Sequence, residues 1–363
     1  MNYKDSGVDT KLETIGLDIF IDNIKQSFNN IPSGVGKVFD DIGYFANVIN
    51  LTNDMSLVVS ADGVGTKVLI AQMMNKYDTI GIDCIAMNIN DIICLGAKPI
   101  SFLDYIALQS PQLELMEQLS EGLLKGAQMV GITIPGGETA QVRDLIKGVR
   151  NNFGFDIAGF GIGMVNPEKI INGSDIKIGD SIIGIESSGL HSNGYSLARK
   201  VLLDSNKYTV DSYIPELQMT LGEELLKPTI IYSSMVNEIL HEDIDVKALI
   251  NITGDGMMNM VRVKRDNIRF AIDYLPDPPP IFKLIQKEGN VSDAEMYNIF
   301  NMGIGFVTVV SHEDEEKIKD TISRFDLKCW KIGRIEKADI KKVNIFPKRL
   351  IGYRRELNEW EDF

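Results

Sequence analysis

The hydrophobic pattern of this chain changes repeatedly between short apolar runs and stripes at helical spacing, which is typical of an α/β protein. After a polar first segment, residues 1–14, that predicts a loop, residues 15–30 predict a helix. The first half then predicts strands at residues 57–61, 99–109, 132–134 and 155–165 and helices at residues 68–74, 78–96 and 112–130. The second half predicts strands at residues 182–186, 246–250, 303–310 and 328–335. It predicts helices at residues 195–203, 227–240 and 313–325 and a further helix after the turn at 251–256.

A polar stretch separates these elements into two groups. Asn166-Pro167 and the segment NGSDIKIGDS interrupt the apolar pattern after the strand predicted at 155–165. A chain of 363 residues is long enough for two domains that each bury a core. We therefore expect an α/β (α+β) fold of two mixed α/β domains, residues 1–166 and 167–345, followed by a C-terminal tail over residues 346–363.

The most informative stretch of the first domain is LVVSADGVGTK, residues 57–67. An apolar β-branched run stops at an aspartate, and two glycines at alternate positions let the backbone turn and approach a ligand. The carboxylate, hydroxyl and ammonium that follow suit Mg²⁺ and phosphate. A hairpin turn, in which Asp-Gly only shapes the backbone, is the alternative for this stretch alone. We expect a nucleotide site that includes Asp62, Gly63, Gly65, Thr66 and Lys67, with the lysine on a phosphate.

Two further places in the same domain carry acids. The helix predicted at 78–96 has a buried apolar stripe, yet Asp83, Asn90 and Asp91 lie on one flank. A flank that only faces solvent more often carries Lys, Glu and Arg, so we interpret this one as facing a ligand. The strand at 132–134 then opens onto Gly137-Glu138-Thr139.

Together these acids predict a site for Mg²⁺ and a nucleoside triphosphate, because Mg²⁺ in proteins takes a few carboxylates plus substrate phosphates. We assign Asp62, Asp91 and Glu138 to the metal. The nucleotide would be supported by Asp83, Asn90, Gly137 and Thr139 in addition to the turn at 62–67.

The second domain contributes two loops that suit an anion. SSGLHSNG, residues 187–194, places hydroxyls, glycines and a histidine before a predicted helix, whose free N–H groups attract phosphate. The turn TGDG, residues 253–256, has a similar composition. We expect the substrate to contact Ser188, Gly189, His191, Ser192, Asn193, Thr253 and Gly254. A single histidine in a loop is commonly incidental, and that alternative stays open for His191.

Three glycines, Gly159, Gly161 and Gly163, recur with a period of two in the strand predicted at 155–165, so they lie on one face. Glycine along one face of a strand indicates that another element packs closely there, as at a barrel wall or a subunit interface.

Composition narrows the function classes. With 37 Lys and Arg against 51 Asp and Glu, the formal charge is −14, which argues against nucleic acid or an anionic membrane as a partner. Three scattered cysteines indicate buried reduced thiols rather than disulfides, and no apolar run reaches the length of a membrane span. These features are typical of a cytoplasmic protein.

The motifs, taken in order, resemble those of the phosphoribosylformylglycinamidine cyclo-ligase family, also called aminoimidazole ribonucleotide synthetases. The resemblance extends over residues 3–335. Its motifs in this chain are YKDSGVD, LVVSADGVGTK, DTIGIDCIAMNINDIICLGAKPISFLDY, GGETA, DIAGFGIG, SSGLHSNGYSLARK, LLKPTIIY, EMYNIFNMGIGF and CWKIG.

The resemblance implies a cytosolic enzyme of purine biosynthesis that uses ATP and Mg²⁺. Such an enzyme closes the imidazole ring of formylglycinamidine ribonucleotide, a phosphorylated ribonucleotide, and releases aminoimidazole ribonucleotide, ADP and phosphate. The amide oxygen takes the γ-phosphoryl group, and a nitrogen then attacks the activated carbon. We expect His191, Lys67 and Asn193 to act in catalysis, and no general base is identifiable. The resemblance also implies a homodimer in which the N-terminal domains contribute strands to an intersubunit β-barrel.

The chain departs from the family pattern in four places. Ser60-Ala61 precedes DGVGTK where the family has Gly-Thr, residues 141–144 replace the Glu-Met-Pro segment after GGETA, Leu190 replaces a proline, and Asp255 replaces a glycine of the TGGG turn. The last change adds negative charge beside a loop expected to bind phosphate.

Two other interpretations remain open. A sister enzyme of the same superfamily, such as thiamine monophosphate kinase or selenophosphate synthetase, would share the acidic nucleotide site. A catalytically silent nucleotide-binding scaffold would be favoured by the loss of one of the three metal acids, and all three are present.

Overall fold

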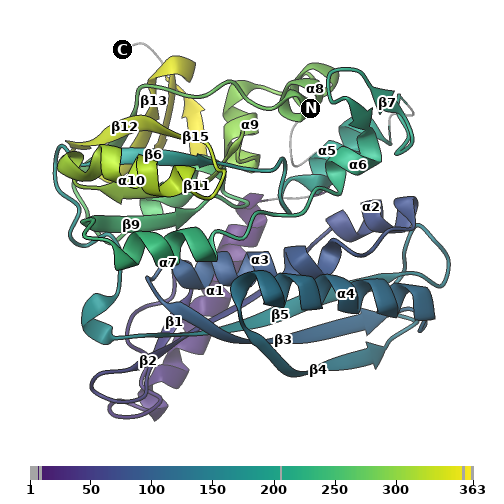
Figure 1. The fold of residues 1–363 in the computed structure, drawn as a ribbon, viewed down its shortest axis with the longest axis horizontal. Helices are drawn as coiled ribbons and strands as arrows, with labels where there is room; N and C mark the ends of the chain where they lie inside the picture. Colours follow the sequence, from purple (N-terminus) through teal and green to yellow (C-terminus); the bar gives the residue numbers. More distant parts are fainter. Residues whose placement is uncertain (1–6, 8–9, 205–206, 354–355, 361–363) are drawn as a thin grey trace.

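A computed structural model, which describes residue 7 and residues 10–204, 207–353 and 356–360, contains one mixed sheet in each half of the chain (Figure 1). The first half contains α1 (Thr10–Lys25), η2 (Gln26–Asn30), β1 (Asn47–Asn50), β2 (Ser56–Gly63), α2 (Lys67–Met74), α3 (Ile80–Ile93), β3 (Lys98–Leu108), α4 (Leu113–Val130), β4 (Thr133–Gln141) and β5 (Phe155–Val165). Its strands form one sheet in the order β1-β2-β5-β3-β4, in which only β3 and β4 are parallel. The α/β class expected from the sequence is confirmed.

The second half forms an eight-stranded sheet in the order β15-β14-β13-β10-β12-β6-β11-β9. Its strands are β6 (Ser181–Glu186), β9 (Val246–Asn251), β10 (Ile268–Ile272), β11 (Ile304–Val310), β12 (Cys329–Lys337), β13 (Lys342–Ile345), β14 (Leu350–Tyr353) and β15 (Glu356–Glu359), and β7 (Tyr213–Ile214) pairs with β8 (Met219–Thr220) apart from it. Its helices are η3 (Pro167–Lys169), α5 (Tyr195–Leu202), α6 (Leu221–Leu225), α7 (Ser233–His241), η4 (Gly256–Arg262), α8 (Pro280–Gly289), α9 (Asp293–Ile299), η5 (His312–Asp314), α10 (Glu315–Ser323) and η6 (Phe346–Lys348).

Three boundaries differ from the sequence prediction. The first helix begins at Thr10, inside the segment predicted as a loop, while most of the YKDSGVD motif lies outside the described residues. The segment after residue 346, predicted as a tail, supplies β14 and β15 to the edge of the second sheet. The helix predicted from Lys227 begins at Ser233, because the preceding backbone groups bind side chains of α3 instead of one another.

Helix α3 lies between the first sheet and the second half of the molecule (Figure 1). Its polar side chains face the second half: the Asn90 amide donates to the Ile230 carbonyl at 2.8 Å and accepts from the Tyr232 N–H at 3.0 Å. Asp83 makes similar contacts with Thr229. The flank expected to face a ligand therefore serves, at Asp83 and Asn90, as the polar contact between the two halves.

The glycine face of β5 packs on α3 of the same chain. A Cβ atom added to Gly161 would lie 2.6 Å from Ile92 Cδ1, and one added to Gly163 would lie 2.5 Å from Ile92 Cγ2. These glycines thus let a helix approach the sheet, and the expectation that they line a subunit interface is wrong.

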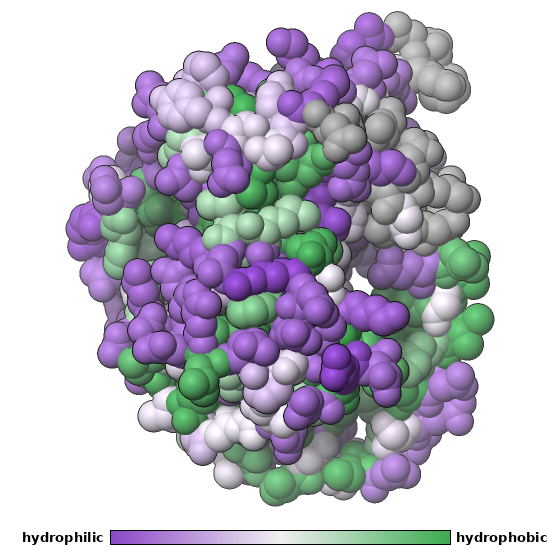
Figure 2. Space-filling model, turned by 90° about the vertical axis from the view of Figure 1, so that its right-hand side faces the viewer, coloured by the Kyte–Doolittle hydropathy of each residue, from purple (hydrophilic) through white to green (hydrophobic). Residues whose placement is uncertain are grey.

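The opposite face of the first sheet carries apolar side chains in contact with solvent. Phe160, which alternates with the glycines, is 46% exposed, and Tyr105 on β3 is 38% exposed. The sheet is open at β1 and β4, so the described residues form no closed barrel. The side of the molecule in Figure 2, by contrast, is mostly hydrophilic with smaller hydrophobic areas.

Candidate functional site

The turn at residues 62–67 joins β2 to α2, as the sequence predicted. Gly65 has φ +68°, a conformation that glycine adopts without strain, and Val64 is buried beneath the turn. Gly65 and Thr66 are exposed, and the Thr66 hydroxyl lies 3.4 Å from the Ser196 hydroxyl at the start of α5. The turn thus presents its backbone where the two halves of the molecule meet.

The Lys67 side chain points away from that surface and is completely buried. Its ammonium lies 2.8 Å from Asp83 Oδ2 and donates to the carbonyls of His191, at 3.1 Å, and Lys227, at 2.6 Å. Burial lowers the pKa of Lys67, while Asp83 opposes that shift. All three donors of the ammonium have acceptors, so this arrangement gives Lys67 a structural contact between the halves and no free direction toward a phosphate.

The loop at 187–194 is held by hydrogen bonds within itself and to residues of the segments at 228–229 and 301. Ser188 Oγ donates to the Pro228 carbonyl at 2.6 Å, and the Ser192 hydroxyl lies 3.1 Å from that of Thr229. The Gly189 carbonyl accepts from Ser187 and from the Asn301 amide. These groups of the predicted substrate set are therefore occupied in shaping the loop.

His191 is part of this internal framework. It is 3% exposed, has φ +60°, and its Nε2 accepts from the Ser188 N–H at 3.3 Å. Burial and the nearby Lys67 lower the pKa of His191 to about 3. The ring is neutral at pH 7. The structure therefore does not support a cationic His191 that stabilises negative charge in the reaction.

A pH-dependence of stability follows for His191. Its pKa is about 3 in the folded protein against about 6.5 when unfolded, so between these values only the unfolded chain binds the proton. Its contribution is complete above pH 6.5 and is lost as the pH falls, with a slope of up to about 1.4 kcal/mol per pH unit. We expect His191→Gln to remove this slope, measured by urea unfolding at pH 7 and pH 5. The exposed His241→Gln is the control, and an unchanged slope in His191→Gln would contradict the assignment.

Asp62 and Asp91 form the acidic part of the site. Burial raises the pKa of both, to about 7 for Asp91, where the charge of Asp62 adds to the effect. Asp62 Oδ1 accepts from the Gly63 N–H at 2.7 Å, and Asp91 Oδ1 accepts from the Asn251 amide at 2.8 Å. The Oδ2 atom of each has no hydrogen-bond donor among the described residues.

Glu138 does not join this pair within the chain. It lies on β4, and three strand-to-strand steps, through Ala158 and Tyr105, separate it from the end of β2. At about 4.8 Å a step this is roughly 14 Å, and Glu138 points to the open face while Asp62 faces α3. Among the described residues no group of three or more His, Cys, Asp or Glu side chains is arranged to hold a metal ion. The predicted three-acid site is therefore not formed within this chain, and Gly137 and Thr139 lie with Glu138 at the edge strand.

Three residues of the predicted substrate set come from two neighbouring loops. Asn193 lies in the loop before α5, and Thr253 and Gly254 lie in the turn after β9. A Cβ atom added to Gly254 would lie 3.3 Å from Asn193 Oδ1, so the two loops are in contact. The Thr253 hydroxyl lies 3.4 Å from Asn259 Oδ1. Asn193, Thr253 and Gly254 are thus the members of the substrate set that the structure brings together at an accessible edge.

A cavity of about 1350 Å³ adjoins this edge between α1 and the second half. Its walls differ in character. The α1 wall is mainly apolar, with Leu17, Phe20, Ile21 and Ile24. The wall from the second half carries both cations and acids, namely Arg262, Lys264, Lys341, Asp255, Glu295 and Glu356. Lys264 and Lys341 are paired with Asp40 and Asp266.

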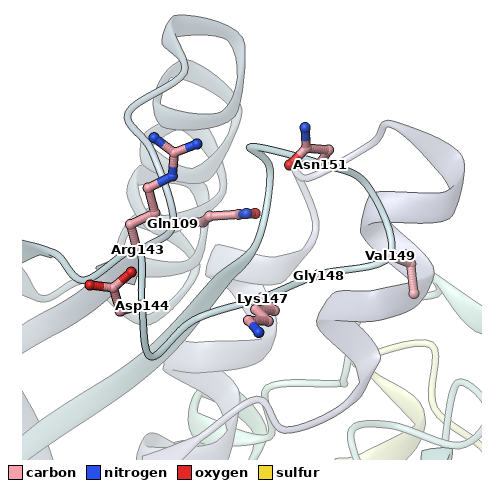
Figure 3. A pocket seen from close by; sticks show the side chains of 7 residues that line it. All are labelled: Gln109, Arg143, Asp144, Lys147, Gly148, Val149 and Asn151. Carbon is pink, nitrogen blue, oxygen red and sulfur yellow. The ribbon is translucent and has the colours of Figure 1, made fainter.

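A second hollow, of about 500 Å³, lies at the loop after β4, where the chain departs from the family pattern (Figure 3). It contains none of the predicted site residues. It is lined by Gln109, Arg143, Asp144, Lys147, Gly148, Val149 and Asn151.

Sequence reasoning missed several residues of the site. Asn251, which binds Asp91, and Arg262, which lies over the Phe45 ring at 5.2 Å, were not recognised. Asn251 lies two residues before the turn at 253–256, and Arg262 ends the short helix after it. Both residues could have been predicted from the sequence as polar residues that flank a glycine-containing turn.

Comparisons with known proteins agree with the motif series. The families described as AIR synthase related protein, N-terminal domain, and AIR synthase related protein, C-terminal domain, match residues 43–165 and 177–345. A phosphoribosylformylglycinamidine cyclo-ligase of Methanobrevibacter smithii is 43% identical over 345 residues, covering 95% of this chain and 97% of the relative. One of Methanocaldococcus jannaschii is 41% identical, covering 97% of each chain.

Solved structures show the same fold at low identity. Thiamine-monophosphate kinase from Stenotrophomonas maltophilia has a TM-score of 0.60 at 16% identity, over 84% of this chain and 90% of that one. The AaThiL complex with AMPPCP and TMP also has a TM-score of 0.60, at 17% identity, over 89% of this chain and 92% of that one.

Proposed function

This chain belongs to the AIR synthase related family, and from that membership we infer that it catalyses the ATP-dependent ring closure of formylglycinamidine ribonucleotide to aminoimidazole ribonucleotide, with release of ADP and phosphate. This is a ligase reaction of de novo purine biosynthesis. The observation that carries the inference is the close similarity to cyclo-ligases along nearly the whole length of both chains.

The reaction proceeds in two steps. The amide oxygen of the substrate attacks the γ-phosphorus of ATP and ADP leaves, which makes the amide carbon electrophilic. A ring-forming nitrogen then attacks that carbon and phosphate departs. The protein contributes mainly positioning and charge neutralisation, as in phosphoryl transfer generally. Asn193, Thr253 and Gly254 hold the substrate, and the exposed backbone of Gly65 and Thr66 meets the nucleotide phosphates.

Asp62 and Asp91 would hold Mg²⁺. Two carboxylates whose Oδ2 atoms have no protein donor fit this cation, which binds through one or two carboxylates plus phosphate oxygens. When bound, Mg²⁺ neutralises phosphate charge. Lys67 and Asp83 stabilise the contact between the halves that positions this pair, and His191 shapes the loop next to it.

We propose that the chain forms a homodimer through the open face of the first sheet, with strands of both copies closing a barrel. The exposed apolar side chains of Phe160 and Tyr105 and the free edge at β4 support this assembly. Glu138 lies on the same face, so dimerisation places it toward the second copy rather than toward Asp62 of its own chain. The protein is proposed to act in the cytoplasm, and among its described residues no helix has the length and apolar character needed to cross a membrane.

Sedimentation tests the assembly. Phe160→Ser removes about 2 kcal/mol of burial from each subunit, and a two-fold interface loses this twice, so we expect association to weaken about 10³-fold. Leu113→Ser, which changes an apolar residue that is 90% exposed on α4, is the control and should leave the dimer intact. A wild type that is monomeric at micromolar concentration would contradict the proposal.

The activity itself is tested by the consumption of ATP, with product analysis for each substrate. We expect ATP consumption and release of ADP and phosphate with formylglycinamidine ribonucleotide, and no consumption above background with thiamine monophosphate or selenide. Consumption with either of the latter alone would assign the chain to a sister activity, and consumption with none of them would favour a nucleotide-binding scaffold.

A further inference from the structure

Arg262 is a cation of the second half that faces the cavity and has unused donors. Its side chain is 31% exposed, and it lies over the ring of the buried Phe45, 5.2 Å from the ring centre. Only Nη2 has a protein partner, Asp255 Oδ2 at 2.5 Å. Nε and Nη1 have no acceptor among the described residues.

The position of Arg262 joins the two parts of the site. Gly254, in contact with Asn193, lines the same cavity as Arg262 and Asp255. The positive charge of Arg262 also acts on the acids of the first half, because it lowers the pKa of Asp62 and of Asp91 against the upward effect of burial. One guanidinium therefore lines the cavity beside the substrate loop at Gly254 and is close enough to the predicted metal acids for its charge to act on them.

A second arginine of the chain shows what a purely structural pair looks like. Arg269 also lies over a phenylalanine, Phe346 at 5.8 Å, and also pairs with a carboxylate, Glu336. It binds Glu336 through both Nε and Nη2, and it does not line the cavity. Arg262 differs in having a single bond to its acid and donors that are free to bind a ligand.

We propose that Arg262 binds the phosphate of the phosphoribosyl substrate and that Asp255 is a counter-charge that limits the strength of this binding. The proposal rests on the proposed function for the identity of the substrate. A guanidinium with free N–H groups suits the oxygens of a phosphate, to which it donates charge-assisted hydrogen bonds. Asp255, which stands where the family motif has glycine, pairs with the same guanidinium and therefore competes with the phosphate for it.

The test uses ribose 5-phosphate as the probe, with binding to the full chain measured by calorimetry and ribose as the unphosphorylated control. We expect Arg262→Gln to weaken binding about 10- to 100-fold, the usual effect of losing charge-assisted hydrogen bonds, and Arg262→Lys to weaken it less. Asp255→Asn should strengthen binding about 3- to 10-fold, because a negative charge near the phosphate is removed. Arg269→Gln should leave binding unchanged.

The opposite signs distinguish the proposal from a structural ion pair. If the pair only stabilises the fold, Arg262→Gln and Asp255→Asn weaken binding alike and lower the melting temperature alike, which overturns the proposal. Unchanged binding in Arg262→Gln, or no binding of ribose 5-phosphate by wild type, also overturns it. Failure of the proposed function is seen separately, as a wild type that binds ribose 5-phosphate through Arg262 but does not convert formylglycinamidine ribonucleotide.

Discussion

Asp91→Asn is expected to reduce phosphate release with formylglycinamidine ribonucleotide about 10²- to 10³-fold while the protein stays folded. Loss of one carboxylate of the Asp62–Asp91 pair removes charge stabilisation worth several kcal/mol at the phosphates, which corresponds to a rate change of this size. The Asn251 contact survives, since an amide oxygen accepts the same hydrogen bond. Calorimetry should show weaker ATP binding in the presence of Mg²⁺, and the melting temperature should change little.

Asp104→Asn is the matched control. Asp104 is also partly buried, and burial raises its pKa. Asp62 and Asp104 both pair with Gly159 of β5, on either side of that strand, so Asp104 faces the same side of the sheet as Asp62 but lies two strands away from it. Its activity should stay near that of wild type. If Asp91→Asn binds ATP and Mg²⁺ as wild type does, Asp91 is not part of the site. If both variants lose activity equally, activity depends on the total negative charge on this face of the sheet rather than on the Asp62–Asp91 pair.

The sequence predicted elements more reliably than the direction in which their side chains point. Helix α3 was expected, with its apolar stripe and its polar flank, and it is present. The flank was interpreted as facing a ligand, whereas Asp83 and Asn90 bind backbone groups at residues 229–232, about 140 positions away. A pattern local to one helix contains no information about such a partner.

The glycines of β5 show the same limit. Their period of two correctly indicated one face of a strand on which another element packs closely, and that element is α3. Whether the element belongs to the same chain or to a second copy cannot be read from the spacing. The apolar residues between the glycines, such as Phe160, are the ones left in contact with solvent.

The order of the strands in the first sheet separates two of the predicted metal ligands. Asp62 and Glu138 both follow apolar strands beside glycines, so each was a reasonable metal ligand in sequence. Strand order β2-β5-β3-β4 then places them on different strands and on opposite faces. Sheet order depends on pairings between distant segments, and a single sequence with its local patterns does not determine them.

Lys67→Met is expected to destabilise the protein by about 3–5 kcal/mol, because it leaves the Asp83 carboxylate buried without its counter-ion. Thr229 continues to donate two hydrogen bonds to Asp83 Oδ1, but the carboxylate loses the Lys67 hydrogen bond at Oδ1 and the ion-pair contact at Oδ2. The carbonyls of His191 and Lys227 lose a donor as well, which weakens the contact between the halves. Urea unfolding measures the change in the free energy of unfolding.

The double variant Lys67→Met/Asp83→Asn separates this structural role from the phosphate contact expected from the sequence. Asparagine keeps an oxygen for Thr229 and carries no charge, so we expect the double variant to recover at least half of the lost stability. A lysine that instead binds phosphate would give a Lys67→Met protein with nearly normal stability and greatly weakened ATP binding. That outcome would contradict the buried arrangement of Lys67 and restore the original expectation, whereas low stability rescued by Asp83→Asn would assign Lys67 to the contact that holds the two halves together.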